Sequence, residues 1–148
     1  MAVFVADEQD RPVDADDLMA LAGRVMLALR VPTDMELSLL LVDEATMASL
    51  NTRHMGVEEP TDVLAFPIDE PGESPAGSPA ILGDVVLCPA VAERQASDAG
   101  HDPADELRLL TVHGILHLVG MDHADPHGER EMTALTDRLL AAHRGERT

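Results

Sequence analysis

The sequence has little cysteine, few aromatic residues and no long apolar run. Each of these shortages excludes a structural feature or a class of protein. The single cysteine, Cys88, allows no internal disulfide, which fits a reducing cytoplasm. Phe4 and Phe66 are the only Phe, Tyr or Trp residues, so the core must be built from aliphatic side chains and methionine. Residues 1–7 lack the basic region and apolar run of a signal peptide, and no stretch approaches the roughly 18–20 apolar residues of a membrane span. We therefore expect a cytoplasmic protein with no membrane partner.

Positive charge is also scarce. The ten basic residues are all Arg, against 28 Asp and Glu, which gives a formal net charge of −18. Such a protein repels polyanions over a Debye length of about 8–10 Å. Composition alone therefore argues against RNA, and any nucleic acid would have to be held by a local patch, by a metal or by a larger assembly.

Length and apolar content indicate a single domain. With 148 residues, 45% of them apolar, the chain is long enough to bury a substantial core. The apolar periodicity predicts the order β-α-β-α-β-β-α-α-α along the chain. This order is typical of a small α/β domain (α+β-like) with a mixed sheet of about four strands packed with about five helices.

The bounds of these elements follow from caps, prolines and apolar spacing. The expected strands are Ala2–Ala6, Glu36–Val42, Thr61–Pro67 and Ile81–Cys88. The expected helices are Ala15–Leu29, a helix capped by Asp43 that runs to about Arg53 or His54, Pro89–Ala99, a helix that opens at Asp102-Pro103, and Glu129–His143. Proline at both flanks of Thr61–Pro67 predicts an edge or terminal strand. Residues 69–80 hold three Pro and two Gly, which predicts a mobile loop, and residues 145–148 are expected to form a tail.

The stretch from His113 to His123 is the most informative part of the chain. His113 and His117 are four residues apart, so on a helix their side chains share one face. Gly120 follows where a helix needs a residue that can turn left-handed and end it, and the chain can then bring His123 beside the other two. Three imidazoles with an open fourth position are typical of a catalytic zinc, because a structural site would close with a fourth protein ligand. The sequence therefore predicts one zinc ion per chain, held by these three histidines.

The combination matters more than any one histidine. A histidine on an apolar helix is usually a packed residue with an ordinary hydrogen bond, and a pair at this spacing raises the odds of a metal site only modestly. A helical pair followed by a glycine and a third histidine is much rarer. Nickel, copper and iron also accept imidazole ligands, so the identity of the native metal stays open.

The predicted site favours hydrolysis. A zinc with three histidine ligands lowers the pKa of its bound water from about 15.7 to about 7 and also acts as a Lewis acid. The spacing His-x-x-x-His-x-x-Gly-x-x-His is that of the metzincin proteases, in which a glutamate after the first histidine is the general base. Here that position is Gly114, which carries no proton-accepting group. We interpret the chain as a zinc-dependent hydrolase domain over residues 1–148, but not as an ordinary metzincin.

Three blocks of the sequence resemble the YbeY endoribonucleases of bacterial ribosomal RNA maturation. The family pattern His-Gly-x-Leu-His-Leu-x-Gly-x-Asp-His matches His113–His123 at every fixed position, and the blocks Pro60–Pro67 and Leu82–Val86 agree as well. The resemblance extends over residues 3–140, approximately the whole chain. It implies a single-domain α/β fold, zinc held by the three histidines, and cleavage of single-stranded RNA in 16S rRNA 3′-end maturation and ribosome quality control. The implied partners are single-stranded rRNA, the small ribosomal subunit and associated assembly proteins, among them a ribosome-associated GTPase.

The chain departs from the family pattern at a few positions. Met121 stands where the family usually has an aromatic residue, and Ala65 stands where it often has serine. The family also uses an arginine near the end of the second helix, whereas this chain has Met55 there and Arg53 two positions earlier. Arg53 is therefore the candidate for stabilising charge on the phosphate, and the alternative is a solvated arginine that interacts with the helix dipole.

The remaining site residues stay open. His113 and Arg53 are the candidate catalytic residues, and no residue is a convincing general base. Three aspartates could orient a ligand histidine through its second nitrogen, or could equally cap a turn: Asp62, Asp84 and Asp122. The other histidines are expected at the surface or in turns: His54, His101, His127 and His143. Of these four, only His54 is expected near the cleft, because it follows Arg53.

Two other functions are compatible with the sequence. One is a non-catalytic ribosome-assembly factor whose zinc orders the fold, and docking through protein would then avoid repulsion between its acidic surface and RNA. The other is a metzincin-like metallohydrolase acting on peptides or another small substrate, which the missing glutamate disfavours.

Overall fold

The computed structural model describes residues 2–56, 61–69, 80–121 and 125–147. Nine elements follow the predicted order, which confirms the α/β class. They are β1 (Ala2–Glu8), α1 (Ala15–Ala28), β2 (Met35–Val42), α2 (Glu44–Met55), β3 (Val63–Pro67), β4 (Ala80–Leu87), α3 (Pro89–Ala99), α4 (Pro103–Leu118) and α5 (Pro126–Arg147).

The bounds agree with the predicted ones within a few residues, except at the last helix. The sequence predicts Glu129–His143, but α5 runs from Pro126 to Arg147, so residues 145–147 of the expected tail are helical. Asp125 accounts for the early start, since its carboxylate accepts a hydrogen bond from the Gly128 backbone N–H at 2.7 Å, as an N-cap does. Most of the expected loop, residues 70–79, lies outside the described residues.

The four strands form one mixed sheet in the order β1-β2-β4-β3. β1 pairs with β2 and β2 pairs with β4 in parallel, whereas β3 pairs with β4 in antiparallel register, Val63 opposite Leu87 and Pro67 opposite Gly83. β3 is thus an edge strand, as its flanking prolines predict.

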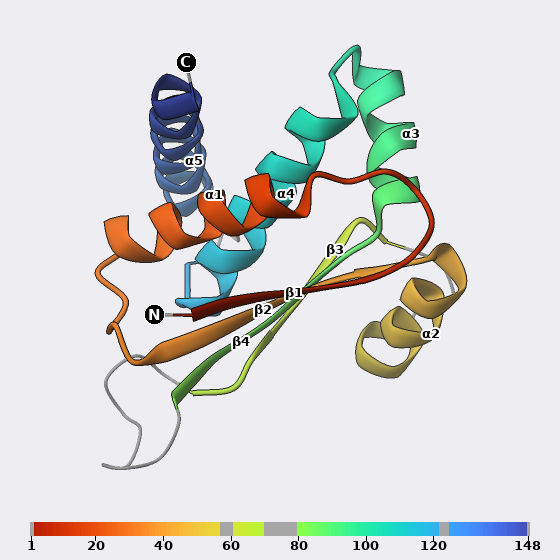
Figure 1. The fold of residues 1–148 in the computed structure, drawn as a ribbon, viewed down its shortest axis with the longest axis horizontal. Helices are drawn as coiled ribbons and strands as arrows, with labels where there is room; N and C mark the ends of the chain where they lie inside the picture. The colour runs from red at the N-terminus through yellow and green to blue at the C-terminus, as the bar shows by residue number, and fades with distance from the viewer. Residues whose placement is uncertain (1, 57–60, 70–79, 122–124, 148) are drawn as a thin grey trace.

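Helices cover the two faces of this sheet unequally. α1, α4 and α5 lie on one side and α2 lies on the other, with α3 near one end of the sheet (Figure 1). Along β2 the side chains alternate between the faces, so Leu37, Leu39 and Leu41 enter the main core. Leu40 and Val42 join a smaller cluster on the other face, together with Met47 of α2 and Cys88.

Local capping residues begin three of the helices where the sequence predicts. Asp14, Asp43 and Asp102 accept hydrogen bonds from backbone N–H groups in the first turns of α1, α2 and α4. At α2 the donor is the Thr46 N–H at 2.8 Å, and its hydrogen bond lowers the pKa of the Asp43 carboxyl below its ordinary value. Among the described residues, none of the helices combines the length and the apolar character needed to cross a bilayer.

Candidate metal centre

His113 and His117 lie on one face of α4 and point toward each other. Their Nε2 atoms are 2.9 Å apart, and their rings meet edge to face with centroids 4.5 Å apart and planes at 70°. Both side chains are half-buried, so solvent and ligands can reach them. α4 ends at Leu118, and Gly120 adopts the left-handed conformation that the sequence predicts, with φ of 92°.

This pair fits the metal that the sequence predicts. Two neutral imidazole nitrogens that converge on one point are the donors zinc prefers, and zinc–nitrogen bonds of about 2.0–2.1 Å place two ligand atoms roughly 3.3 Å apart in a tetrahedral site. The observed 2.9 Å is close to that separation. His123, the third predicted ligand, lies outside the described residues, as does Asp122. Within the described ranges, no three His, Cys, Asp or Glu side chains gather as a metal site, so the three-histidine site stays a prediction.

Gly114 explains why the metzincin glutamate has no place here. A Cβ built at Gly114 would lie 2.6 Å from Cγ1 of Val85, since α4 packs directly on β4 at this point. Position 114 therefore faces the sheet, whereas its neighbour His113 faces the site. A glutamate at this position would clash with the core before it could reach a metal, which disfavours the protease alternative on steric as well as chemical grounds.

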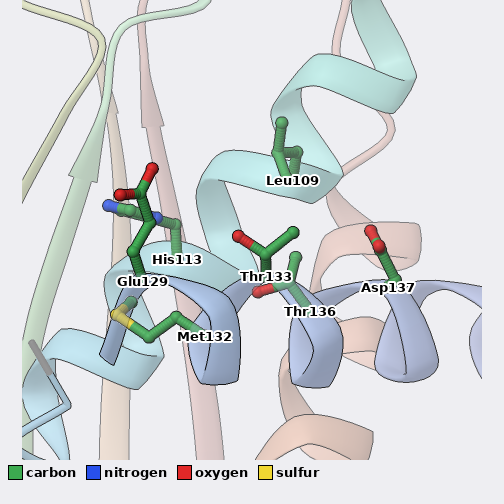
Figure 2. A pocket seen from close by; sticks show the side chains of 7 residues that line it. All are labelled: Leu109, His113, Glu129, Met132, Thr133, Thr136 and Asp137. Carbon is green, nitrogen blue, oxygen red and sulfur yellow. The ribbon is translucent and has the colours of Figure 1, made fainter. Parts of the chain in front are cut away.

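Hollows flank the two histidines. One pocket of about 200 Å³ lies between α4 and α5, and Figure 2 shows His113 at one end of it beside Glu129. A second hollow of about 520 Å³ borders His117 and the turn after α4, with Pro67, Ile68 and Asp69 at the end of β3 on its other side. A ligand held at the histidine pair would therefore have room on both sides of α4.

Arg53 lies on α2, the helix on the opposite face of the sheet from α4. Its side chain is exposed, and its guanidinium donates a hydrogen bond to the Ser49 hydroxyl at 3.1 Å. The neighbouring His54 packs against the Phe66 ring of β3, with ring centroids 4.2 Å apart. The structure thus does not bring Arg53 beside the histidine pair directly, because the edge strand β3 lies between the two helices.

Neither of the two described aspartates that were candidate orienting residues hydrogen-bonds to the histidine pair within the described residues. The Asp62 carboxylate accepts hydrogen bonds from the Val63 N–H and the Thr61 hydroxyl, which hold a local turn. Asp84 lies on β4 and lines a hollow with Phe4 and Ser38 on the sheet face away from α4. The position of Asp62 agrees with the alternative of holding a turn, whereas Asp84 lies within β4 and caps no turn.

His143 corrects one expectation. The sequence predicts a surface position, but His143 is 1% exposed and its Nε2 lies 2.8 Å from Oδ1 of Asp17. His101 and His127 are exposed, as expected. Burial also raises the pKa of the Cys88 thiol, so this cysteine is an inert core residue rather than a metal ligand.

Sequence reasoning missed the α5 residues that line the interhelical pocket. They are Glu129, Met132, Thr133, Thr136 and Asp137. In the sequence they look like ordinary positions of an amphipathic helix, and nothing local shows that α5 packs beside His113. The only signal was a pair of threonines at i, i+3 on the same helix, which is too common to predict a site.

Comparison with known proteins agrees with this fold. The family model described as Endoribonuclease YbeY matches residues 4–144. Curated proteins named Endoribonuclease YbeY from Salinispora tropica and Thermobifida fusca are each 53% identical to the chain, over 100% and 97% of it and 99% and 95% of their own lengths. The protein of the same name from Mycobacterium tuberculosis is 48% identical over 95% of this chain and 82% of its own.

A solved structure shows the same architecture. The solution structure of TM1509 from Thermotoga maritima superposes with a TM-score of 0.66 at 26% identity, and the match covers 99% of this chain and 91% of that protein. The family match spans nearly the whole chain and includes the helix that carries His113 and His117. The chain therefore belongs to the Endoribonuclease YbeY family.

Proposed function

We propose that this protein is a zinc-dependent endoribonuclease that cleaves single-stranded RNA. The convergence of the His113 and His117 Nε2 atoms within 2.9 Å on α4 is the observation that carries the proposal. Membership of a family named for endoribonuclease activity supports the reaction, and the hollow of about 520 Å³ beside His117 offers room for a strand.

Each predicted site residue has a distinct task in this proposal. His113, His117 and His123 hold one zinc ion, which when bound supplies an activated water and a Lewis acid for phosphodiester hydrolysis. His113 also borders the interhelical pocket, so it contacts the substrate side of the site. Arg53 stabilises negative charge on the phosphate backbone, and an RNA strand that crosses the edge strand β3 can contact both α4 and α2.

The biological setting proposed is cytoplasmic 16S rRNA 3′-end maturation and ribosome quality control. The net charge of −18 is unfavourable for holding RNA by charge alone. The small ribosomal subunit and its assembly proteins, among them a ribosome-associated GTPase, would supply the missing attraction by binding the protein beside its rRNA substrate.

The proposal is tested by measuring metal content and cleavage of a single-stranded RNA for the wild type and His113→Ala. We expect stoichiometric zinc and metal-dependent cleavage in the wild type, and loss of both in the variant, because a metal ligand is gone. His101→Ala is the matched control, since His101 is exposed in the turn between α3 and α4. It should retain zinc and cleavage.

The alternative outcomes separate the competing functions. Equal cleavage by wild type and His113→Ala would show that the RNase activity is a contaminant and would favour a non-catalytic assembly factor. Stoichiometric zinc in His117→Ala would overturn the ligand assignment itself.

A further inference from the structure

The interhelical pocket of about 200 Å³ between α4 and α5 has the features of a small binding site. Its lining residues are Leu109, His113, Glu129, Met132, Thr133, Thr136 and Asp137. Pockets for drug-sized ligands are roughly 300–1,000 Å³, so this one suits a single ring system rather than a length of chain. Figure 2 shows its order along α5: Glu129 stands beside His113 at one end, the two threonines lie in the middle, and Asp137 stands at the far end.

The middle of the pocket combines an apolar wall with an unused hydroxyl. Met132 is 3% exposed, and with Leu109 it provides aliphatic surface for the face of a ring. Thr136 is only 5% exposed, and its hydroxyl makes no hydrogen bond with the described part of the chain. This hydroxyl lines the pocket and is not one of the buried polar atoms that lack a partner, so it is open to a polar group of a ligand.

The two carboxylates define what that ligand must offer. Glu129 and Asp137 are exposed and form no ion pair within the described residues, and an ionised carboxylate can only accept hydrogen bonds. They repel phosphate, so the pocket cannot be a phosphate subsite. A ligand with N–H donors on one edge and a flat apolar face fits Asp137, Thr136 and Met132, whereas Glu129 stands at the other end, beside His113.

A nucleobase meets these requirements better than a basic side chain does. His113 and Asp137 lie at opposite ends of the pocket, so the base of a nucleotide whose phosphate lies at the histidine pair would extend along the pocket toward Asp137. Single-stranded RNA is recognised through bases that are splayed out and read on their Watson–Crick edges. Guanine presents two adjacent donors, N1–H and N2–H, which match one carboxylate, whereas uracil presents a single N–H between two carbonyl oxygens that a carboxylate repels.

We propose that the pocket between α4 and α5 binds the base of the nucleotide beside the scissile phosphate and prefers guanine. Asp137 accepts hydrogen bonds from the guanine N1–H and N2–H, the Thr136 hydroxyl donates to the carbonyl oxygen O6, and the ring packs on Met132. This inference deepens the proposed RNA cleavage and rests on it. In this arrangement the acidic residues of the pocket contribute to RNA binding, because they accept hydrogen bonds from a base and do not contact the phosphate backbone.

Nuclear magnetic resonance titrations with mononucleotides test the pocket without any cleavage. The probes are the 5′-monophosphates of guanosine, inosine and uridine, where inosine lacks the 2-amino group. We expect the guanosine nucleotide to shift the backbone amides of Thr133 and Thr136 and to bind about tenfold more tightly than the uridine nucleotide, with inosine between them. Equal shifts with all three nucleotides, or shifts elsewhere only, would overturn the proposal.

Single substitutions test the contacts that Asp137 and Thr136 are proposed to make with the guanine base. Asp137→Asn should lose about tenfold in affinity for the guanosine nucleotide and leave the uridine nucleotide unaffected. Thr136→Val keeps the side-chain shape but removes the hydroxyl, and it should weaken guanosine and inosine nucleotides alike. The matched control is Glu131→Gln on the same helix, because Glu131 pairs with His127 and does not line the pocket. Unchanged guanosine binding in Asp137→Asn would contradict the proposal.

Three further outcomes separate this inference from the proposed function. Cleavage of uridine-rich RNA beside a single guanosine would support both. Metal-dependent cleavage with no guanosine preference, together with equal nucleotide binding, would reject the base pocket and leave the ribonuclease intact. If an arginine amide shifted the same amides and the guanosine nucleotide did not, the pocket would bind a basic side chain of a protein, and the base proposal would be wrong.

Discussion

At the scale of single residues, this acidic protein can bind a phosphate only where an arginine side chain is available. Arg11, Arg94 and Arg108 are committed to ion pairs with carboxylates of the chain. Arg53 instead donates to the neutral Ser49 hydroxyl and forms no ion pair within the described residues. Its charge is therefore available to a ligand, which supports its proposed role at the RNA backbone.

Arg53→Ala should lower RNA cleavage by about tenfold at limiting RNA, because it removes a cationic contact to the RNA backbone away from the histidine pair. Zinc content should not change, since α2 lies across the sheet from the histidine pair. Cleavage kinetics and metal analysis on the same preparation measure both effects. Arg144→Ala, at an exposed position of α5, is the control that changes net charge equally. If both variants lose the same activity, the effect is one of overall charge and Arg53 has no special role.

At the scale of elements, the packing of α4 on the sheet sets the position of the histidine pair. Gly114 allows the helix to approach β4 closely, since a Cβ there would lie 2.6 Å from Val85. This contact fixes the distance between α4 and the sheet, and with it the position of the neighbouring helix residues. His113 and His117 owe their mutual geometry to the helix, but their distance from β3 depends on this close approach.

Gly114→Ala should destabilise the protein by about 1–3 kcal/mol, because the added methyl overpacks the interface between α4 and β4. Gly23→Ala is the matched substitution, since Gly23 lies inside α1 and a Cβ there would have no neighbouring atom within 4 Å. It should stabilise the protein by about 0.5–1 kcal/mol through helix propensity. Urea unfolding measures both. A stabilised Gly114→Ala would mean that α4 can move away from the sheet at little cost.

At the scale of the whole molecule, a buried polar cluster joins three helices that are distant in sequence. The Asp17 carboxylate of α1 binds Arg108 Nε of α4 at 2.7 Å and His143 Nε2 of α5 at 2.8 Å. The three side chains are 7%, 13% and 2% exposed. Arg108 also binds Asp105 at 2.7 Å, so one network fixes how α5 lies against α4 and hence the width of the interhelical pocket.

Asp17→Ala should destabilise the fold by about 3 kcal/mol, because it leaves the charge of Arg108 buried with only Asp105 as its partner. Glu93→Ala breaks the exposed pair with Arg11, whose side chains are 46% and 49% exposed, and should cost about 1 kcal/mol or less. Thermal unfolding of both variants against wild type checks the contrast. Similar losses in the two variants would show that the buried cluster does not hold the helices together.

The sequence by itself determined what depends on near neighbours in the chain. The i, i+4 spacing places His113 and His117 on one helical face, Gly120 ends that helix, and aspartates cap α1, α2 and α4, because each effect acts over a few residues. The order of strands and helices follows from apolar periodicity for the same reason. The prolines that flank β3 likewise predicted its place at the edge of the sheet.

Only the tertiary structure decided what depends on long-range packing. It placed α2 and Arg53 on the far face of the sheet, buried His143 against Asp17, and lined one pocket with His113 of α4 and with Thr136 and Asp137 of α5. None of these contacts has a local signature, since the partners are separated by tens of residues or more and meet only when helices pack on a shared sheet. The spacing of side chains shows which face of a helix or strand a residue occupies. Which other element covers that face depends on how all the elements pack to bury the core.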